Sequence, residues 1–362
     1  MGGIETQVRA LAGHQAAAGD EVRVVTATPG HAGVFAGDDE VDGLVVHRVA
    51  AHLPFELPVH PRTTTEVGRL LDRHPVDVVH VHAGVVSPFA WGAIRAATRR
   101  GLPTLVTIHS VWGPVAGPGF RASNALLRWS AWGATLSAVS TVAADRIAAS
   151  VARSGPVLVV PNGIEPADWA VTHVPGDDAV LRVTSVMRMA PRKRTLALVR
   201  IIAAAARQAP EGVGLSAVLV GDGPDRRRAE RYVEGEGLAP VVRFTGRLER
   251  PAILDVFARS DVYVQPSVRE SFGLAALEAR TAGLPVVARS QTGTTEFVRE
   301  GVEGLLAPDD TGMARALARL ASDRELLSRI ARHNRSTAPA EAWPSVLATV
   351  RGAYAEAAAR AR

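Results

Sequence analysis

The 362-residue chain has no cysteine, and 40 of its 41 basic residues are arginine, so that Lys193 is its only lysine. Without cysteine there is no disulfide framework, no thiolate metal site and no cysteine nucleophile. No stretch reaches the roughly 18 consecutive apolar residues of a membrane-spanning helix, and no charged-then-apolar leader opens the chain. Aromatic residues make up only 5% and do not alternate with basic ones, which disfavours a nucleic-acid groove. We therefore expect a cytoplasmic protein that binds no nucleic acid.

The residues that are present are those of a folded globular protein. Hydrophobic residues make up 47% and charged residues 21%, which excludes wholesale disorder. The length exceeds what one ordinary core supports, so two domains are expected. The net charge is +5, with the positive excess in the second half of the chain. A basic second half suits an anionic small ligand.

Short runs rich in valine, isoleucine and leucine form two successive series, separated by helical patterns. Such strands, buried on both faces, indicate parallel doubly wound sheets and hence two Rossmann-like domains with a cleft between them. The polar stretch 163–178 marks the boundary, which predicts domains over 1–167 and 168–340. The expected strands are 21–27, 44–50, 77–83, 104–110 and 157–163, then 181–187, 215–221, 241–246, 261–267 and 284–289.

The chain opens directly at a glycine-rich turn, "MGGIETQ", and no strand precedes it. A Rossmann-type domain normally begins with a central strand that leads into such a turn. We therefore expect the first strand of the first domain to be missing, which would expose two inner strand edges. Either the start is misassigned or truncated, or an unusual segment fills the gap.

The most informative stretch is "VRESFGLAALEARTAGLPVVA", residues 268–288, where Glu270 and Glu278 lie eight residues apart. Eight residues are about 2.2 helical turns, so the two carboxylates do not stack on one face. With a helix beginning near Ser271–Phe272, Glu270 would lie in the preceding loop and Glu278 within the helix. Alternatively, Glu270 only caps the helix and Glu278 lies on the surface.

The start of the same helix is also an anion-binding candidate. First-turn amides have no partner inside a helix, and the helix dipole favours negative charge near them. A phosphate could bind there while the two acids hydrogen-bond hydroxyl groups on either side. The residues predicted for this site are Ser271, Phe272, Gly273 and Leu274.

Lys193 lies in "SVMRMAPRKRT", just beyond a predicted strand end. A lysine ammonium is a compact, rotatable point charge, whereas an arginine guanidinium is a planar fork with five donors. In a chain that otherwise uses arginine, a single lysine can mark a position where a fork does not fit. The alternative is a solvated basic run that includes Arg192 and Arg194.

The E-x7-E pattern, followed by "AGLPVVA", resembles the hallmark of retaining glycosyltransferase family 4, which has the GT-B fold. Further segments follow in the order that this family uses, and the resemblance covers nearly the whole chain. They are "GGIETQVRALAGHQAAAGDEVRVVT", "DVVHVHAG", "LPTLVTIHS", "TLSAVSTVAADRI", "VVPNGIE", "SVMRMAPRKR", "LVGDGPDR", "VRFTGRL" and "GTTEFVREGVEGLLA". The resemblance implies that the first domain binds the acceptor and the second binds a nucleotide-sugar, with a C-terminal helix, 341–362, crossing back onto the first domain.

The resemblance also implies roles for individual residues. Arg188 and Lys193 would neutralise the donor diphosphate, because preorganised cations stabilise the charge that grows on a leaving group. Glu278 would hold the ribose hydroxyls and Glu270 would face the transferred sugar. Gly3 matches a glycine whose backbone approaches the diphosphate, a place that suits a residue without a side chain.

His109 ends the strand "TLVTIH", at the carboxyl edge where open α/β sheets bind ligands. A histidine at a strand end can be structural, but the family places there a histidine that contacts the sugar. His80 and His82 alternate in "DVVHVHAG" on one face of a strand, and we interpret both as structural because no third metal ligand accompanies them.

The predicted activity is retaining transfer of a hexose from a UDP- or GDP-sugar to a hydroxyl acceptor, by front-face substitution, in cell-envelope glycoconjugate synthesis. No D-x-D metal motif occurs, since the acidic segment 37–43 is predicted to lie in a loop, so we expect neither a metal nor a cofactor. The acceptor would be a sugar, a lipid-linked sugar or a small molecule. An amphipathic segment, 119–140, either contacts a membrane surface or packs against the first sheet.

Three alternatives stay open from the sequence. A GT-B relative that epimerises a nucleotide-sugar would need acid/base side chains that no motif identifies. An inactive family member would fit a truncated start. A nicotinamide dehydrogenase is disfavoured, because Arg226 replaces the third glycine of the fingerprint in "GDGPDR".

Overall fold

The computed structural model describes residues 3–30, 36–51, 60–112, 116–151 and 156–361. The chain forms two compact units. Unit 1 comprises Met1–Gly163 together with Trp343–Arg362, and unit 2 comprises Ile164–Ala342. The sequence had placed the boundaries at 167/168 and 340/341.

Unit 2 contains a six-stranded sheet in which every pair is parallel, as its near-continuous apolar strands predict. The strand order is β10-β9-β8-β11-β12-β13. The strands are β8 (Val180–Val186), β9 (Gly214–Val220), β10 (Val242–Gly246), β11 (Val262–Gln265), β12 (Val286–Arg289) and β13 (Gly304–Ala307). The helices are α6 (Thr195–Gln208), α7 (Arg226–Gly235), α8 (Arg250–Ala258), α9 (Leu274–Thr281), α10 (Asp310–Ser322) and α11 (Arg324–Ser336).

The order of this sheet reverses direction between β8 and β11. From β8 the chain adds β9 and β10 on one side, and from β11 it adds β12 and β13 on the other. In open α/β sheets the crevice outside the carboxyl ends of the two strands at such a switch point is the usual ligand site. The loops that follow β8 and β11 contain Lys193 and Glu270, respectively.

Unit 1 contains two separate sheets, with orders β1-β3-β2 and β4-β5-β6-β7. Their strands are β1 (Arg23–Thr26), β2 (Ala36–Val41), β3 (Leu44–Val49), β4 (Val79–Ala83), β5 (Thr104–Ile108), β6 (Thr135–Ala138) and β7 (Leu158–Val159). The helices are α1 (Gly3–Ala17), α2 (Thr63–Arg73), α3 (Pro88–Thr98), α4 (Ala116–Leu127), α5 (Thr141–Ser150) and α12 (Trp343–Ala361).

Unit 1 is divided into two sheets, and this division lies where the sequence led us to expect a missing strand. Among the described residues α1 comes before any strand, and β1 and β4 are each the end strand of their sheet. Val25 of β1 nevertheless packs against the core cluster that contains Val81 of β4. The two sheets therefore share a core although no hydrogen-bonded strand joins them.

The acidic segment 37–43 was predicted to be a loop, and this prediction is wrong. Ala36–Val41 forms β2, which pairs antiparallel with β3. Most of β2 is exposed, so it is an end strand with little of the apolar alternation that identifies a buried strand. Its carboxylates are used in this hairpin, where Asp39 bonds the buried Arg48 at 2.7 Å.

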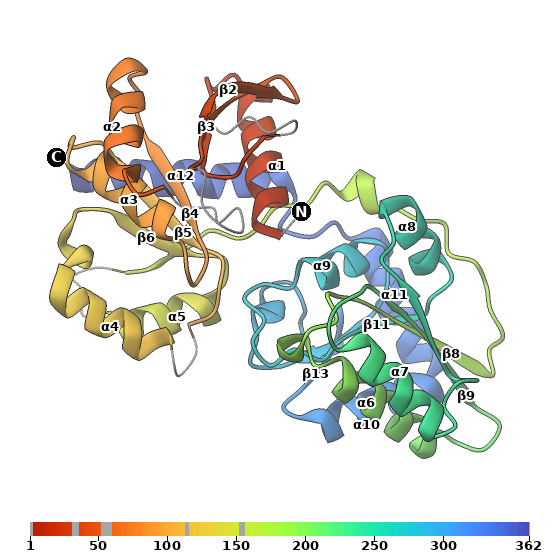
Figure 1. The fold of residues 1–362 in the computed structure, drawn as a ribbon. Helices are drawn as coiled ribbons and strands as arrows, with labels where there is room; N and C mark the ends of the chain where they lie inside the picture. The colour runs from red at the N-terminus through yellow and green to blue at the C-terminus, as the bar shows by residue number, and fades with distance from the viewer. Residues whose placement is uncertain (1–2, 31–35, 52–59, 113–115, 152–155, 362) are drawn as a thin grey trace. The chain divides into compact units, whose positions relative to one another are not determined.

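The last helix, α12, returns the chain to unit 1, as the resemblance implied, and is drawn in blue among that unit's elements in Figure 1. Trp343, Val346 and Val350 pack into a core cluster with Leu11 of α1 and Leu105 of β5. Neither α12 nor any other described helix is long and apolar enough to cross a bilayer.

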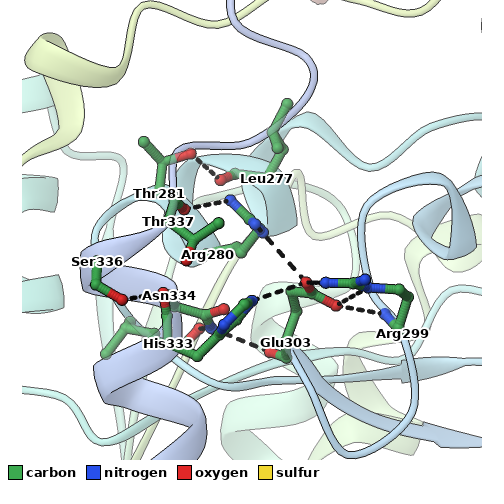
Figure 2. Close-up of polar contacts among 10 residues, drawn as sticks. Leu277, Arg280, Thr281, Arg299, Glu303, His333, Asn334, Ser336 and Thr337 are labelled. Atoms are coloured by element: carbon green, nitrogen blue, oxygen red, sulfur yellow. Dashed lines mark hydrogen bonds and ion pairs between the residues drawn. The ribbon is translucent and has the colours of Figure 1, made fainter.

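A buried carboxylate, Glu303, connects α9 and α11 to the start of β13 in unit 2 (Figure 2). Arg299 donates to both of its oxygens, His333 lies 3.0 Å away and Arg280 of α9 lies 3.9 Å away. Burial alone would raise the pKa of Glu303, but the hydrogen bonds from Arg299 and His333 lower it to about 2. Because Arg280 is two residues from Glu278, this cluster also holds the helix that carries that acid.

Candidate functional site

Glu270 lies in the loop before α9, as predicted, but the helix begins slightly later than the sequence indicated. Its first residue is Leu274, and Gly273 is the N-cap with φ +100°. That left-handed conformation strains any residue with a side chain, which explains glycine here. The delayed start leaves residues 270–273 as a turn that carries Glu270 into the interior, where the residue is 8% exposed.

The start of α9 offers unused donors. Among the described residues, no hydrogen bond engages the amides of Phe272, Gly273 or Leu274, whereas Ala276 and Leu277 already bond the carbonyl of Gly273. These are the amides predicted for the anion site. Ser271, the fourth predicted residue, is partly buried and already has a partner.

Lys193 and Glu270 meet in unit 2 although 77 residues separate them. Nζ of Lys193 lies 2.5 Å from Oε2 of Glu270, and both side chains are largely shielded from solvent. Gln265, the last residue of β11, donates from Nε2 to the same oxygen at 2.9 Å. The structure thus joins two of the predicted residues directly and adds a third that the sequence did not identify.

The basic run around Lys193 is not one solvated patch. Arg192 is exposed, whereas Arg194 makes a bidentate pair with Asp310 at 2.8 Å and donates to the carbonyl of Pro266. Arg289 contacts the same carboxylate of Asp310. The hydrogen bond from Arg194 lowers the pKa of Asp310. Arginine forks therefore fix the loop, and the lysine alone reaches Glu270.

Arg188 follows β8, is exposed and has no ion-pair partner among the described residues, so its charge is available to an anion. The turn that carries it rests on the "GDG" segment. A Cβ on Gly221 would lie 1.9 Å from the carbonyl oxygen of Met187, and one on Gly223 would lie 2.4 Å from that of Met189. These glycines allow the close approach that places Arg188.

Gly293 supports the turn before α9 in the same manner. Its amide donates to the carbonyl of Glu270 at 2.9 Å. A Cβ at this position would lie 2.0 Å from the carbonyl oxygen of Ser271 and 2.8 Å from the amide nitrogen of Phe272. The backbone of the "GTTE" segment therefore packs closely against the backbone of Ser271 and Phe272, at the predicted anion site.

Glu278 lies within α9, as predicted, and is partly buried. Burial raises its pKa to about 7, and the charge of Arg250 acts in the opposite direction. The carboxyl therefore changes charge near neutral pH. A buried carboxyl whose charge changes near neutral pH is a functional-site candidate on physical grounds, and its assignment to the ribose hydroxyls stays a prediction.

In unit 1, His109 follows β5 and is held from two sides. Its Nε2 lies 2.9 Å from Nδ1 of His82, and it also bonds the side chain of Asn162. Burial lowers the pKa of His109 to about 4, against the effect of Asn162. A neutral His109 that donates to Asn162 accepts from His82 through Nε2, so its two ring nitrogens are both engaged.

His80 belongs to a second hydrogen-bond chain, which supports its structural interpretation. The hydroxyl of Ser137 donates to the carbonyl of Val106, so Thr107 donates to Ser137 and accepts from Nε2 of His80. Nδ1 of His80 then accepts from Tyr354 of α12 at 3.0 Å. This series of hydrogen bonds connects α12 to β4, β5 and β6. Burial lowers the pKa of His80 to about 3 and holds that of His82 well below its usual range.

Gly3 is the first residue of α1 and is exposed, so its backbone is accessible within unit 1. Its predicted approach to a diphosphate stays a prediction. No group of three histidine, aspartate or glutamate side chains in the described ranges is arranged to hold a metal ion. From the sequence, we expect first-half loops around 28–43, 51–62 and 111–120 to select the acceptor. Residues 31–35, 52–59 and 113–115 of these loops lie outside the described residues.

The contacts that sequence reasoning missed are those made by residues without a catalytic signature. Gln265 ends a strand that reads only as apolar, and Asn162 lies in "VVPNG". The one usable signal was the polar amide at the end of β11, at the strand edge where ligands bind.

Comparison with known proteins assigns both units to glycosyltransferases. A family model described as "Glycosyltransferase Family 4" matches residues 1–168. A second model, described as "Glycosyl transferases group 1", matches residues 180–323. The two matches correspond closely to the two structural units.

Two curated relatives show the range of similarity. The D-inositol 3-phosphate glycosyltransferase of Kribbella flavida is 34% identical over 221 residues, which cover 52% of this chain and 52% of that protein. The phosphatidylinositol N-acetylglucosaminyltransferase gpi3 subunit of Schizosaccharomyces pombe is 25% identical over 338 residues, 89% of this chain and 70% of that protein. The chain thus matches about half the length of the first of these relatives.

Solved structures share the fold. Sucrose-phosphate synthase from Thermosynechococcus elongatus superposes with a TM-score of 0.74 and 21% identity, covering 98% of this chain and 93% of that one. Anabaena HepE in complex with UDP-glucose gives a TM-score of 0.65 and 20% identity, covering 87% and 85%. With two Rossmann-like units and both halves matched, the chain belongs to glycosyltransferase family 4 and has the GT-B fold.

Proposed function

We propose that the protein is a retaining glycosyltransferase that moves a hexose from a UDP- or GDP-sugar to a hydroxyl acceptor. The observation that carries this proposal is the arrangement at the switch point of unit 2. There Lys193 meets Glu270, beside the unused amides at the start of α9. Cations and oriented amides suit a diphosphate, and a neighbouring carboxylate suits sugar hydroxyls. The nucleotide-sugar in the Anabaena structure supports a donor of this class.

The proposed chemistry is substitution on one face of the sugar. The bond between the anomeric carbon and the phosphate oxygen breaks while the acceptor oxygen bonds the same carbon from the same side. The acceptor proton passes to the departing phosphate. Arg188, Lys193 and the amides of Phe272 and Gly273 stabilise the charge that develops on the leaving group. In this mechanism Glu270 orients the sugar. A contact between His109 and the sugar is proposed from the family resemblance alone. Neither a metal ion nor an organic cofactor is proposed to take part.

A panel of nucleotide-sugars, scored by slow hydrolysis and by transfer, tests the proposal, with Glu270→Ala as the matched variant. Release of nucleoside diphosphate from one donor, lost in the variant, would support it. Equal rates in both proteins would remove Glu270 from the site. A new epimer formed from donor alone would identify an epimerase instead, and a covalent sugar on Glu270 would exclude front-face substitution.

For the acceptor, we propose a hydroxyl of a phosphorylated or lipid-linked polyol. Both curated relatives are named for inositol phosphates or phosphatidylinositol, so inositol phosphates are the first acceptors to test. Helix α4 supports contact with a lipid surface, because Leu126 is 82% and Leu127 is 57% exposed, next to Arg128. Co-sedimentation with anionic vesicles, lost in a Leu126→Glu, Leu127→Glu variant, tests this contact.

A further inference from the structure

Two donors from different elements converge on one oxygen of Glu270. Gln265 donates from β11 at 2.9 Å and Lys193 approaches from the loop after β8 at 2.5 Å, both to Oε2. Oε1 has no partner among the described residues. The carboxylate is thus held by one oxygen, and the other is left to accept a hydrogen bond.

The orientation of the Gln265 amide follows from this contact. If the amide were turned over, Oε1 of Gln265 would face the carboxylate, and two acceptors would oppose each other. With Nε2 toward Glu270, Oε1 of Gln265 is buried without a partner in the described part of the chain. The residue is 3% exposed, so water does not compete easily for the amide.

We propose that Gln265 is a positioning residue that fixes the carboxylate of Glu270 and presents Oε1 to a hydroxyl of the donor sugar. The inference rests on the proposed function. Lys193 alone cannot serve this purpose throughout a turnover, because its ammonium is also attracted to the donor diphosphate. The amide of Gln265 is neutral and buried, so it keeps its hold on Oε2 when the lysine turns toward phosphate.

A misplaced carboxylate affects reaction more than binding. Displacement of a reacting or orienting group by about 1 Å can reduce turnover by about a hundredfold. Nucleotide binding, by contrast, depends on the cations and amides, which Gln265 does not touch. Loss of the amide should therefore lower kcat by roughly tenfold to a hundredfold and leave the affinity for UDP or GDP within about twofold.

The test uses Gln265→Met, which keeps the length of the side chain and removes the donor, in the wild-type and Glu270→Ala backgrounds. If Gln265 acts through Glu270, the substitution lowers kcat in the wild type and has no further effect in Glu270→Ala. Tyr263→Phe is the structural control. It removes a hydroxyl from the same strand that bonds the carbonyl of Val186 at 3.1 Å, and leaves Glu270 untouched. Its kcat should stay near that of the wild type.

Equal losses from Gln265→Met in both backgrounds would overturn the proposal, as would a loss no larger than that of Tyr263→Phe. If Glu270→Ala is impaired but Gln265→Met is not, only this inference fails. If Glu270→Ala turns over donors at the wild-type rate, Glu270 is not in the site and this inference fails with it. If the wild type turns over no nucleotide-sugar of the panel, the proposed function itself fails.

A crystal structure of the UDP complex supplies a test that does not depend on activity. The expected result is a retained contact of about 3 Å between Gln265 and Glu270 while Nζ of Lys193 moves toward a phosphate oxygen. A complex in which this contact is broken and Lys193 still holds Glu270 would overturn the inference.

Discussion

Nζ of Lys193 lies 2.5 Å from Oε2 of Glu270. The only lysine of the chain thus pairs with the first acid of its most informative motif, across the switch point between β8 and β11. The neighbouring Arg194 has another partner, since it binds Asp310 through both terminal nitrogens. The position of the single lysine therefore has a geometric explanation, because Lys193 contacts Glu270 while Arg194 contacts Asp310.

Replacing Lys193 by arginine should lower kcat/KM for the donor by about tenfold or more, because a planar fork cannot occupy the space of a compact ammonium between Glu270 and a phosphate. The measurement is steady-state donor turnover. Arg192→Lys is the matched control, an exposed neighbour with the opposite exchange, and should be neutral. Full activity of Lys193→Arg would show that arginine serves equally well at this position, and that the lysine reflects composition and not function.

Gly293→Ala should abolish nucleotide binding while the protein stays folded. The added Cβ would lie 2.0 Å from the carbonyl oxygen of Ser271, so the backbone before α9 must move away from its anion-binding geometry. Binding of UDP and GDP by calorimetry, with circular dichroism for folding, checks this. Gly235→Ala, where the new Cβ meets nothing within 4 Å, is the control. Unchanged affinity in Gly293→Ala would show that this backbone does not bind the nucleotide.

The buried histidines should make the protein acid-labile. The pKa of His109 is lowered to about 4 and that of His80 to about 3, so the unfolded chain binds more protons than the native one below about pH 6.5. Stability is therefore present near neutral pH and is lost as the pH falls from 6.5 toward about 4, by about 3 kcal/mol for His109 alone.

Denaturant unfolding at pH 7 and pH 4.5 measures this loss. Glu303 does not affect stability in this pH range. Its pKa falls from 4.5 to about 2 on folding, so the stability that it contributes to the folded protein is lost only below about pH 4.5. His109→Asn should flatten the dependence between pH 6.5 and 4.5. An unchanged slope in that variant would contradict the assignment to His109.

Glu278 should make nucleotide affinity rise with pH. Burial raises its pKa to about 7, so between pH 6 and 8 it gains the charge that accepts hydrogen bonds from ribose hydroxyls. The same shift makes the acid oppose the histidines in stability, since a raised carboxyl pKa lowers stability as the pH climbs from about 4.5 to 7. Calorimetric titrations of UDP at several pH values, in the wild type and in Glu278→Gln, isolate the effect. Identical pH profiles would exclude Glu278 from the nucleotide site.

Glu303→Gln should lower the free energy of unfolding by about 3 kcal/mol, because it removes one partner of a buried charge cluster and takes the carboxylate at 3.9 Å away from the buried Arg280. Chemical denaturation at pH 7 measures the change. Glu234→Gln on the exposed face of α7 is the control for loss of one acidic charge and should be near neutral. A change below about 0.5 kcal/mol for Glu303→Gln would show that the cluster is not stabilising.

The amino-acid sequence determined the elements, because apolar runs and helical periods are local. Its ten expected strands all appear, and unit 1 has two separate sheets where a missing first strand was expected. Three short strands were missed. One of them, β2, is exposed and acidic and is held by its pairing with β3, which a local pattern does not reveal.

Sequence spacing also determined which side chains follow the strand ends, including Lys193 and Glu270 in unit 2 and His109 in unit 1. Only the tertiary structure decided which of them meet. The order of the sheet places the end of β8 beside that of β11. Lys193 and Gln265 therefore both reach one carboxylate oxygen, Oε2 of Glu270. The structure likewise decided the protonation of His109, because burial and two hydrogen-bond partners fix an imidazole's charge and tautomer, and neither can be counted along a chain.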